Sequence, residues 1–300
     1  MTTPPTESAQ PTFTIGGDLP VHRLGYGAMQ ITGEGIWGPP ADHDGALRVL
    51  RRAVELGVDF IDTADSYGPT VSEELIAEAL HPYPESLVIG TKAGLTRTGP
   101  GQWHALGFPE YLKQQCELSL RRLKVDCIDL FQLHRVDARV PLADQLGALV
   151  DLQQQGKVRH IGLSEVTVSQ LRAALEITSV ATVQNLYNVG NRAVEPLLDA
   201  CASAGIGFIP WFPVQTGELA AAGGPLDELS RTTGHTPAQL ALAWLIQRSP
   251  VVLPIPGTKS VQHLEENCAA ATITLDGPTV EALDALVDAG TDPESTGTSR

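Results

Sequence analysis

Short apolar segments alternate with amphipathic segments along the whole chain. The amphipathic segments repeat apolar residues at helical spacing, as at Leu142, Leu146 and Leu149, and glycines such as Gly57 and Gly205 mark helix ends. The short segments are mostly apolar throughout, which is typical of strands buried on both faces. We expect eight such strands, at residues 24–29, 58–62, 87–92, 128–133, 158–164, 182–188, 206–212 and 251–255.

Strict alternation of strands and helices implies parallel strands, each followed by a helix. Eight such units in a chain of 300 residues predict an α/β fold, a closed (β/α)8 TIM barrel, with a doubly wound sheet as the alternative. No change of composition marks a linker, so residues 13–290 are predicted to form a single barrel domain. The polar segments 1–12 and 291–300 are predicted to be disordered tails.

Two elements are expected in addition to the eight units. Residues 13–15 and 21–22 flank a Gly-Gly-Asp turn at 16–18, which predicts an N-terminal β-hairpin that closes the barrel floor. Apolar residues at helical spacing predict an extra C-terminal helix over residues 279–289.

Charge and cysteine content narrow the classes of partner and compartment. A formal net charge of −15 argues against nucleic acid and against an anionic membrane surface. The apolar segments fall short of the ~18 residues that a membrane span requires, and no signal peptide is recognisable. The four cysteines stand singly, so we expect reduced thiols, no metal site and a cytoplasmic protein. A monomer is the default expectation.

One glycine motif imitates a nucleotide-binding fingerprint. Residues 33–38, GEGIWG, match G-x-G-x-x-G letter for letter. The true fingerprint leaves a strand and opens a helix whose N-terminus binds the pyrophosphate, whereas Pro39-Pro40 follows here at once. We therefore expect a loop over the mouth of the barrel.

Polar side chains stand at the ends of three successive predicted strands. Asp62 ends the second strand and Tyr67 follows it, Lys92 ends the third, and His134 follows the fourth. Each alone has an ordinary explanation as a helix cap, a packing residue, a surface lysine or a satisfied histidine. In a barrel all four would lie at the C-terminal mouth, where TIM barrels perform their chemistry, so together they predict an active site.

At these residues the chain resembles the aldo-keto reductase family, over roughly residues 13–288. The matching stretches are LGYGAM (24–29), GVDFIDTADSYG (57–68), TK (91–92), LRRLKVDCIDLFQLH (120–134), GKVRHIGLSEVT (156–167), VQNLYN (183–188), PWFPV (210–214) and IPGTKSVQHLEEN (255–267). The proline-bearing segments AMQITGEGIWGPP, SYGP and PWFP are most similar to the bacterial pyridoxal-reductase branch.

The resemblance implies catalytic roles for the four strand-end residues. Tyr67 would be the general acid, Lys92 its activator, Asp62 the partner of the lysine, and His134 a group that polarises the carbonyl. A free tyrosine titrates near pH ~10. An ammonium roughly 4 Å away at an effective dielectric of about 20 favours the phenolate by about 4 kcal/mol, so we expect the pKa of Tyr67 to fall towards ~7.

The resemblance also implies NADPH across the mouth, with NADH less expected. Ser164 and Gln184 would hold the nicotinamide carboxamide, and Trp211 would stack on its ring. Lys259 and His263 would face the ribose 2′-phosphate, although many relatives present an arginine in that segment. Glu165 replaces the asparagine of many relatives and is a doubtful contact. The other implied contacts are Gly27, Ala28, Met29, Asp62, Phe212, Pro213, Val214, Gly217, Leu219, Pro256, Gly257, Thr258, Glu266 and Asn267.

The expected substrate is a small carbonyl compound reduced to an alcohol, with pyridoxal or another aromatic or heteroaromatic aldehyde as one candidate. Trp37 and Trp103 would sandwich a flat ring, and Arg135 would meet a polar substituent. Alternatives are a broad-specificity reductase of ketones or keto-sugars, a nucleotide-sensing binding module, and a barrel aldolase that uses Lys92 to form a Schiff base. Borohydride trapping distinguishes the aldolase, and turnover of any aldehyde excludes the binding module.

Overall fold

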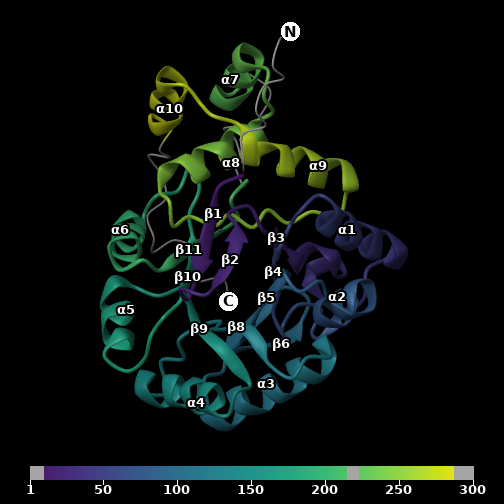
Figure 1. The fold of residues 1–300 in the computed structure, drawn as a ribbon, viewed down its shortest axis with the longest axis vertical. Coiled ribbons are helices and arrows are strands. Elements are labelled where there is room, and N and C mark those ends of the chain that lie inside the picture. Colours follow the sequence, from purple (N-terminus) through teal and green to yellow (C-terminus); the bar gives the residue numbers. More distant parts are fainter. Residues whose placement is uncertain (1–9, 215–222, 287–300) are drawn as a thin grey trace.

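The computed structural model describes residues 10–214 and 223–286. Within them, seven parallel strands form one curved sheet in the order β11-β10-β9-β8-β5-β4-β3. Helices α1–α6, α8 and α9 surround this sheet, and α7 and α10 lie farther out (Figure 1). The sheet strands are β3 (Tyr26–Gly27), β4 (Phe60–Asp62), β5 (Val88–Ala93), β8 (Ile128–Leu133), β9 (Val158–Ser164), β10 (Thr182–Leu186) and β11 (Gly207–Trp211).

The gap between the first and last strands of this sheet is closed by the segment 251–254. Phe208 of β11 exchanges backbone hydrogen bonds with this segment, donating to Val251 and accepting from Leu253, both at 2.8 Å. On the other side, the Gly25 N–H donates to the Pro254 carbonyl at 3.0 Å. The eight positions therefore form a closed ring, which confirms the (β/α)8 barrel and excludes the doubly wound alternative.

The eighth position is less regular than predicted. Instead of a strand over 251–255, the structure has one parallel bridge, between Phe208 and Val252. Pro254 and Pro256 have no N–H to donate, so this segment cannot form a regular ladder with β3. The first strand is also shorter than predicted, because the chain turns into a 3-10 helix, η1, over Ala28–Ile31.

Ten α-helices are described. They are α1 (His43–Glu55), α2 (Val71–Leu80), α3 (Pro109–Leu123), α4 (Leu142–Gln154), α5 (Val168–Leu175), α6 (Glu195–Ala204), α7 (Pro225–Thr233), α8 (Pro237–Arg248), α9 (Val261–Ala269) and α10 (Gly277–Asp284). In the part of the chain that the structure describes, no helix combines the length and the apolar character that a membrane crossing requires.

The predicted N-terminal hairpin is present. β1 (Thr12–Ile15) and β2 (Leu19–His22) pair antiparallel around the Gly-Gly-Asp turn. Ile15, Leu19 and Val21 are buried in one cluster with strand residues such as Phe60 and Leu130, so the hairpin closes one end of the barrel. In Figure 1 it lies across the middle of the ring of helices.

The remaining predicted boundaries differ in detail. β1 begins at Thr12, one residue inside the predicted tail, and the rest of both tails is almost entirely outside the described residues. The C-terminal helix is α10, which ends at Asp284 rather than at 289, and residues 287–289 lie outside the description. Two elements were not predicted: α7, and a hairpin formed by β6 (Leu95–Gly99) and β7 (Gln102–Ala105) after β5.

Candidate active site

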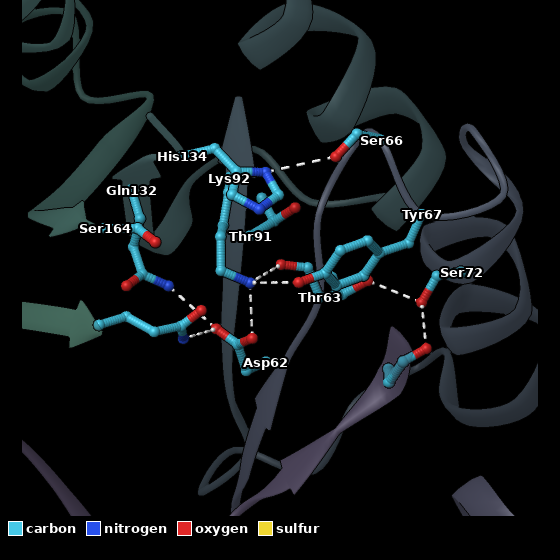
Figure 2. Close-up of polar contacts among 12 residues, drawn as sticks. Asp62, Thr63, Ser66, Tyr67, Ser72, Thr91, Lys92, Gln132, His134 and Ser164 are labelled. Atoms are coloured by element: carbon cyan, nitrogen blue, oxygen red, sulfur yellow. Dashed lines mark hydrogen bonds and ion pairs between the residues drawn. The ribbon is translucent and has the colours of Figure 1, made fainter. Parts of the chain in front are cut away.

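The sheet brings the predicted catalytic residues together. β4, β5 and β8 are neighbours, so Asp62 at the end of β4, Lys92 on β5 and His134 just after β8 meet at one end of the barrel. Tyr67 reaches the same point from the loop after β4 (Figure 2). All four side chains are buried or nearly so.

Lys92 is the centre of this cluster. Its ammonium donates to Asp62 Oδ2 at 2.6 Å, to the Thr63 carbonyl at 2.8 Å and to the Tyr67 hydroxyl at 3.2 Å. These three acceptors match the three N–H donors of an ammonium group. Lys92 has no exposed surface, so its charge is retained by the paired carboxylate rather than by water. The pKa of Lys92 is raised because Asp62 and Tyr67 outweigh the effect of burial.

Asp62 is itself held by two amides. Its Oδ1 accepts from the side chains of Gln132 and Gln184, each at 3.0 Å, while Oδ2 accepts from Lys92. Gln132 was missed by the sequence analysis. The available signal was a polar residue at 132 inside an otherwise apolar strand, two positions before His134.

The pKa of Tyr67 differs from the expectation. Burial raises the pKa above its ordinary value of ~10, and the attraction of Lys92 only partly offsets this. The predicted fall towards neutrality counted the ammonium and neglected desolvation. The phenol is therefore protonated at neutral pH.

His134 is held as a neutral imidazole. Its Nδ1 lies 3.3 Å from Ser66 Oγ, and its ring meets the Tyr67 ring edge to face at a centroid distance of 5.8 Å. Burial is the main cause that sets the pKa of His134 well below its usual value, and the cations Lys92, Arg135 and Arg97 lower the pKa further. A neutral imidazole with one nitrogen at Ser66 leaves the other nitrogen for a ligand.

These residues open onto a cavity of about 850 Å³ at the mouth of the barrel. Most of its lining is apolar or aromatic, with a few polar groups, which is typical of a small-molecule site. Three of the four catalytic candidates line it, and Lys92 lies behind them. The other predicted residues that line it are Gly27, Met29, Trp103, Arg135, Ser164, Gln184, Trp211, Phe212, Pro213, Val214 and Gly257.

Eight predicted cofactor residues lie outside the cavity lining. Ala28, Pro256 and Thr258 are buried directly next to lining residues in the sequence, and Asn267 is buried within α9. Glu266 is half-buried, and Lys259 and His263 are exposed near the N-terminus of α9. Glu165 is the eighth, and its backbone is in the left-handed region, at φ 54°. Its carboxylate accepts from the Leu186 N–H at 2.9 Å and from the indole N–H of Trp211, so it orients the indole. Gly217 and Leu219 lie outside the described residues.

The predicted sandwich between two indoles does not form. Trp103 lines the cavity, but Trp37 does not. The guanidinium of Arg97 lies over both rings instead, 3.6 Å from the Trp103 centroid and 5.8 Å from the Trp37 centroid. Arg135 does line the cavity, with its Nη1 donating to the His134 carbonyl at 2.8 Å and to Ser164 Oγ at 3.1 Å.

A nicotinamide dinucleotide fits the residues at this mouth. A hydroxyl at Ser164, an amide at Gln184 and the flat indole of Trp211 line one side of the cavity. Glycines at 27 and 257 let the segment before α9 lie directly against β3, since a Cβ on Gly27 would meet the Ile255 carbonyl at 2.6 Å. The free backbone N–H groups at the start of α9 favour the binding of an anion such as a phosphate. Within residues 10–214 and 223–286, no cluster of His, Cys, Asp or Glu is arranged to bind a metal ion.

The model of the Aldo/keto reductase family matches residues 23–288. The chain belongs to the aldo-keto reductase family. It is an NAD(P)H-dependent oxidoreductase of the pyridoxal-reductase-like branch.

Two sequence relatives support this family assignment. An uncharacterised oxidoreductase of Schizosaccharomyces pombe is 50% identical over 268 residues, covering 89% of this chain and 87% of that protein. Pyridoxine 4-dehydrogenase of Escherichia coli is 43% identical over 281 residues, covering 92% and 98%.

Solved structures agree with the barrel. An aldo-keto reductase of Klebsiella pneumoniae in complex with NADPH superimposes with a TM-score of 0.78 at 28% identity, covering 95% of this chain and 98% of that chain. Glycerol dehydrogenase of Gluconobacter oxydans gives a TM-score of 0.84 at 25% identity, covering 95% and 99%.

Proposed function

We propose that this aldo-keto reductase uses NADPH to reduce an aldehyde or ketone to the alcohol, with Tyr67 as the general acid. The observation that carries the proposal is the position of the Lys92 ammonium, 2.6 Å from Asp62 and 3.2 Å from the Tyr67 hydroxyl, directly behind the cavity. A cation on the phenol stabilises the negative charge that remains when the phenol gives up its proton.

The bound nicotinamide supplies the hydride, and the side chains at the mouth handle charge and proton. As negative charge develops on the carbonyl oxygen, the Tyr67 hydroxyl donates its proton to that oxygen. The neutral imidazole of His134 offers a second hydrogen bond from the nitrogen that does not face Ser66. Both groups are buried, so no water must be reorganised as the charge forms.

Preference for NADPH over NADH rests on Lys259 and His263. Both side chains are exposed at the start of α9, and the free N–H groups of a helix N-terminus favour an anion there. A lysine and a histidine at this position favour a ribose phosphate over a hydroxyl.

The substrate is an aromatic or heteroaromatic aldehyde such as pyridoxal. Support comes from the similarity to pyridoxine 4-dehydrogenase and from the cavity itself, where Trp103 presents an aromatic wall and Arg135 a cation. A flat ring packs on the indole, and a phenolic or other electron-rich substituent accepts from the guanidinium.

The decisive experiment replaces Tyr67 by Phe and follows NADPH oxidation with pyridoxal and with 4-nitrobenzaldehyde. Loss of the general acid lowers kcat by about 10²–10⁴-fold, while NADPH binding, measured by fluorescence, is unchanged. Tyr83→Phe is the matched control, because its part-buried hydroxyl makes one hydrogen bond, which it donates to the Leu123 carbonyl at 2.7 Å, and Tyr83 lines no part of the cavity. Near-normal turnover by Tyr67→Phe would remove the proposed role.

Substrate class is tested separately with the wild-type enzyme. Pyridoxal and 4-nitrobenzaldehyde should show a higher kcat/KM than butanal, because only the aromatic aldehydes pack on Trp103. Pyridoxal phosphate should perform worse than pyridoxal, because the protein carries a net charge of −15 and repels a dianion. Equal efficiency with all four would indicate a broad-specificity reductase and leave the reductase activity itself intact.

A further inference from the structure

The unpredicted hairpin β6–β7 carries an arginine that the reaction does not use. We propose that Arg97 is a positioning residue that fixes the Trp103 wall of the cavity against Tyr67 and His134, and that it thereby favours aromatic carbonyl substrates. This inference rests on the proposed function, since it names the residue that shapes the substrate side of the same cavity.

Arg97 joins three segments that are remote in sequence. Within its own hairpin it donates to the carbonyls of Gln102 at 2.8 Å and Gly99 at 3.4 Å. It also donates to Ile36 at 2.7 Å and Gly35 at 2.8 Å in the loop over the mouth, and to Ser66 at 3.1 Å. A guanidinium has five N–H groups, and these five bonds match that number.

The hairpin depends on such bonds for its position. β6 and β7 form a sheet of their own and pair with none of the described barrel strands. An isolated two-stranded hairpin is marginally stable in water. Its other polar connections to the rest of the molecule include the Gly101 N–H donating to Gly35 at 3.0 Å and the Tyr111 hydroxyl donating to Leu95 at 3.4 Å. Arg97 therefore provides much of the connection between the hairpin and the backbone at Gly35, Ile36 and Ser66.

Trp103 is the hairpin residue that contacts the two predicted catalytic rings at the cavity. Its ring lies edge to face with Tyr67 and with His134, at centroid distances of 6.4 Å in each case. The guanidinium of Arg97 lies over the indole at 3.6 Å from its centroid. Leu95 and Ala105 of the same hairpin also line the cavity, so a shift of the hairpin moves three lining residues relative to Tyr67 and His134.

Arg97 is a buried cation that no carboxylate of the described residues pairs with. The side chain is buried, and within the described residues it forms no ion pair. Burying a cation among neutral groups is costly unless hydrogen bonds and a ring face compensate. Lysine, with a single compact ammonium, cannot reach the three segments at once.

The matched control is Arg23. This arginine is equally buried and also donates to backbone carbonyls, those of Val252 at 3.1 Å, Ser249 at 2.9 Å and Ile246. It directly follows β2 of the N-terminal hairpin and lines no part of the cavity. If Arg97 only stabilises the fold, Arg97→Met and Arg23→Met lose stability alike and keep the wild-type kinetics in their folded fraction.

The experiment compares 4-nitrobenzaldehyde with butanal in the wild type, Arg97→Met, Arg97→Lys and Arg23→Met. For both Arg97 variants we expect KM for the aromatic aldehyde to rise roughly tenfold, because the substrate ring loses its packing on a fixed indole. KM for butanal and kcat for both aldehydes should change by less than about threefold. The reason is that none of the hydrogen bonds of the Lys92 ammonium involves Arg97. Arg23→Met should leave the preference unchanged. If Arg97→Met does not fold, Arg97→Lys decides.

A double-mutant cycle tests the route through the indole. In a Trp103→Leu background, Arg97→Lys should alter the aromatic preference by less than about twofold. Additive effects, or equal KM changes for both aldehydes, would overturn the inference while leaving the reductase function intact.

Acrylamide quenching of tryptophan emission needs no turnover. Quenching should increase in Arg97→Lys and not in Arg23→Met. In the Trp103→Leu background, Arg97→Lys should cause no such increase. If quenching does not increase in Arg97→Lys, the inference about Arg97 is wrong, whether or not the wild type reduces a carbonyl. A wild type that reduces no carbonyl would contradict the proposed function alone.

Discussion

Replacement of Lys92 by Met should destabilise the fold and abolish reduction for two separable reasons. Lys92 and Asp62 are a fully buried ion pair at 2.6 Å. Removing one member leaves the other charge buried and unpaired, which costs about 3–5 kcal/mol. For a chain of this size each kcal/mol lowers the unfolding midpoint by about 2 °C, so we expect a loss of about 6–10 °C.

Removing both charges should restore most of that stability. In the double variant Asp62→Asn/Lys92→Met, the carbonyl of the introduced amide can still accept from the side chains of Gln132 and Gln184, which lie 3.0 Å from the wild-type Oδ1. We expect the double variant to lie within about 1–2 kcal/mol of the wild type. It should nevertheless be inactive, because the Tyr67 phenol lacks its cation. The stability and the chemistry of the pair are thereby measured independently.

The assay is thermal unfolding by circular dichroism, followed by NADPH oxidation with a reactive aldehyde on the same samples. Asp62→Asn alone is the complementary single variant, and it leaves the lysine without its counter-ion. If Lys92→Met unfolds within about 2 °C of the wild type, the buried pair does not have the energetic weight that its geometry indicates. If the double variant is as active as the wild type, the ammonium is not needed by Tyr67.

Three further predictions follow from titratable and charged groups. Burial raises the pKa of Tyr67, and alcohol oxidation needs the phenolate, so the rate of oxidation should rise about tenfold per pH unit up to that pKa. The rate of carbonyl reduction should stay constant around neutral pH. A plateau in the oxidation rate below pH ~8 would contradict this prediction. The pKa of buried Asp65 is raised well above its usual value, so its ionisation in the unfolded state costs stability above pH ~4. Asp65→Asn should therefore raise the unfolding midpoint at neutral pH, with a gain that shrinks towards pH ~4, and a pH-independent gain would refute the assignment. Lys259→Met should weaken NADPH binding by about 1.5–3 kcal/mol and leave NADH binding unchanged, as measured by fluorescence titration, and equal weakening would place Lys259 elsewhere.

The barrel and the gathering of Asp62, Lys92 and His134 at one end of it were predictable because both depend on local patterns. Buried parallel strands are apolar over their length, so polar residues at the strand ends, Asp62, Lys92 and His134, stand out in the sequence. The pKa of Tyr67 could not be predicted in the same way, because desolvation depends on every neighbour of the ring. The wrong direction came from counting one charge and no burial.

The β6–β7 hairpin and Arg97 required tertiary information. Gly99-Pro100-Gly101 is a turn signal that could have indicated the hairpin, but no sequence pattern connects Arg97 to Ile36, 61 positions earlier, or to Ser66. The two-indole sandwich failed for the same reason, since a cation from a third segment lies over both rings. Lys259, His263 and the substrate class stay predictions.

The closure between segment 251–254 and the first strand has a consequence for biosynthesis. The Arg23 guanidinium donates to the Val252 carbonyl across 229 positions of sequence. During translation, the residues at the start of the first strand therefore cannot meet their final neighbour until 229 further positions of the chain have been synthesised. Until then the edges of β3 and β11 are open, and open strand edges pair readily with other chains. Nascent chains of this enzyme should accordingly depend on chaperones until the last βα unit is synthesised, and a destabilised closure should lower the yield of folded enzyme more than its activity per folded molecule.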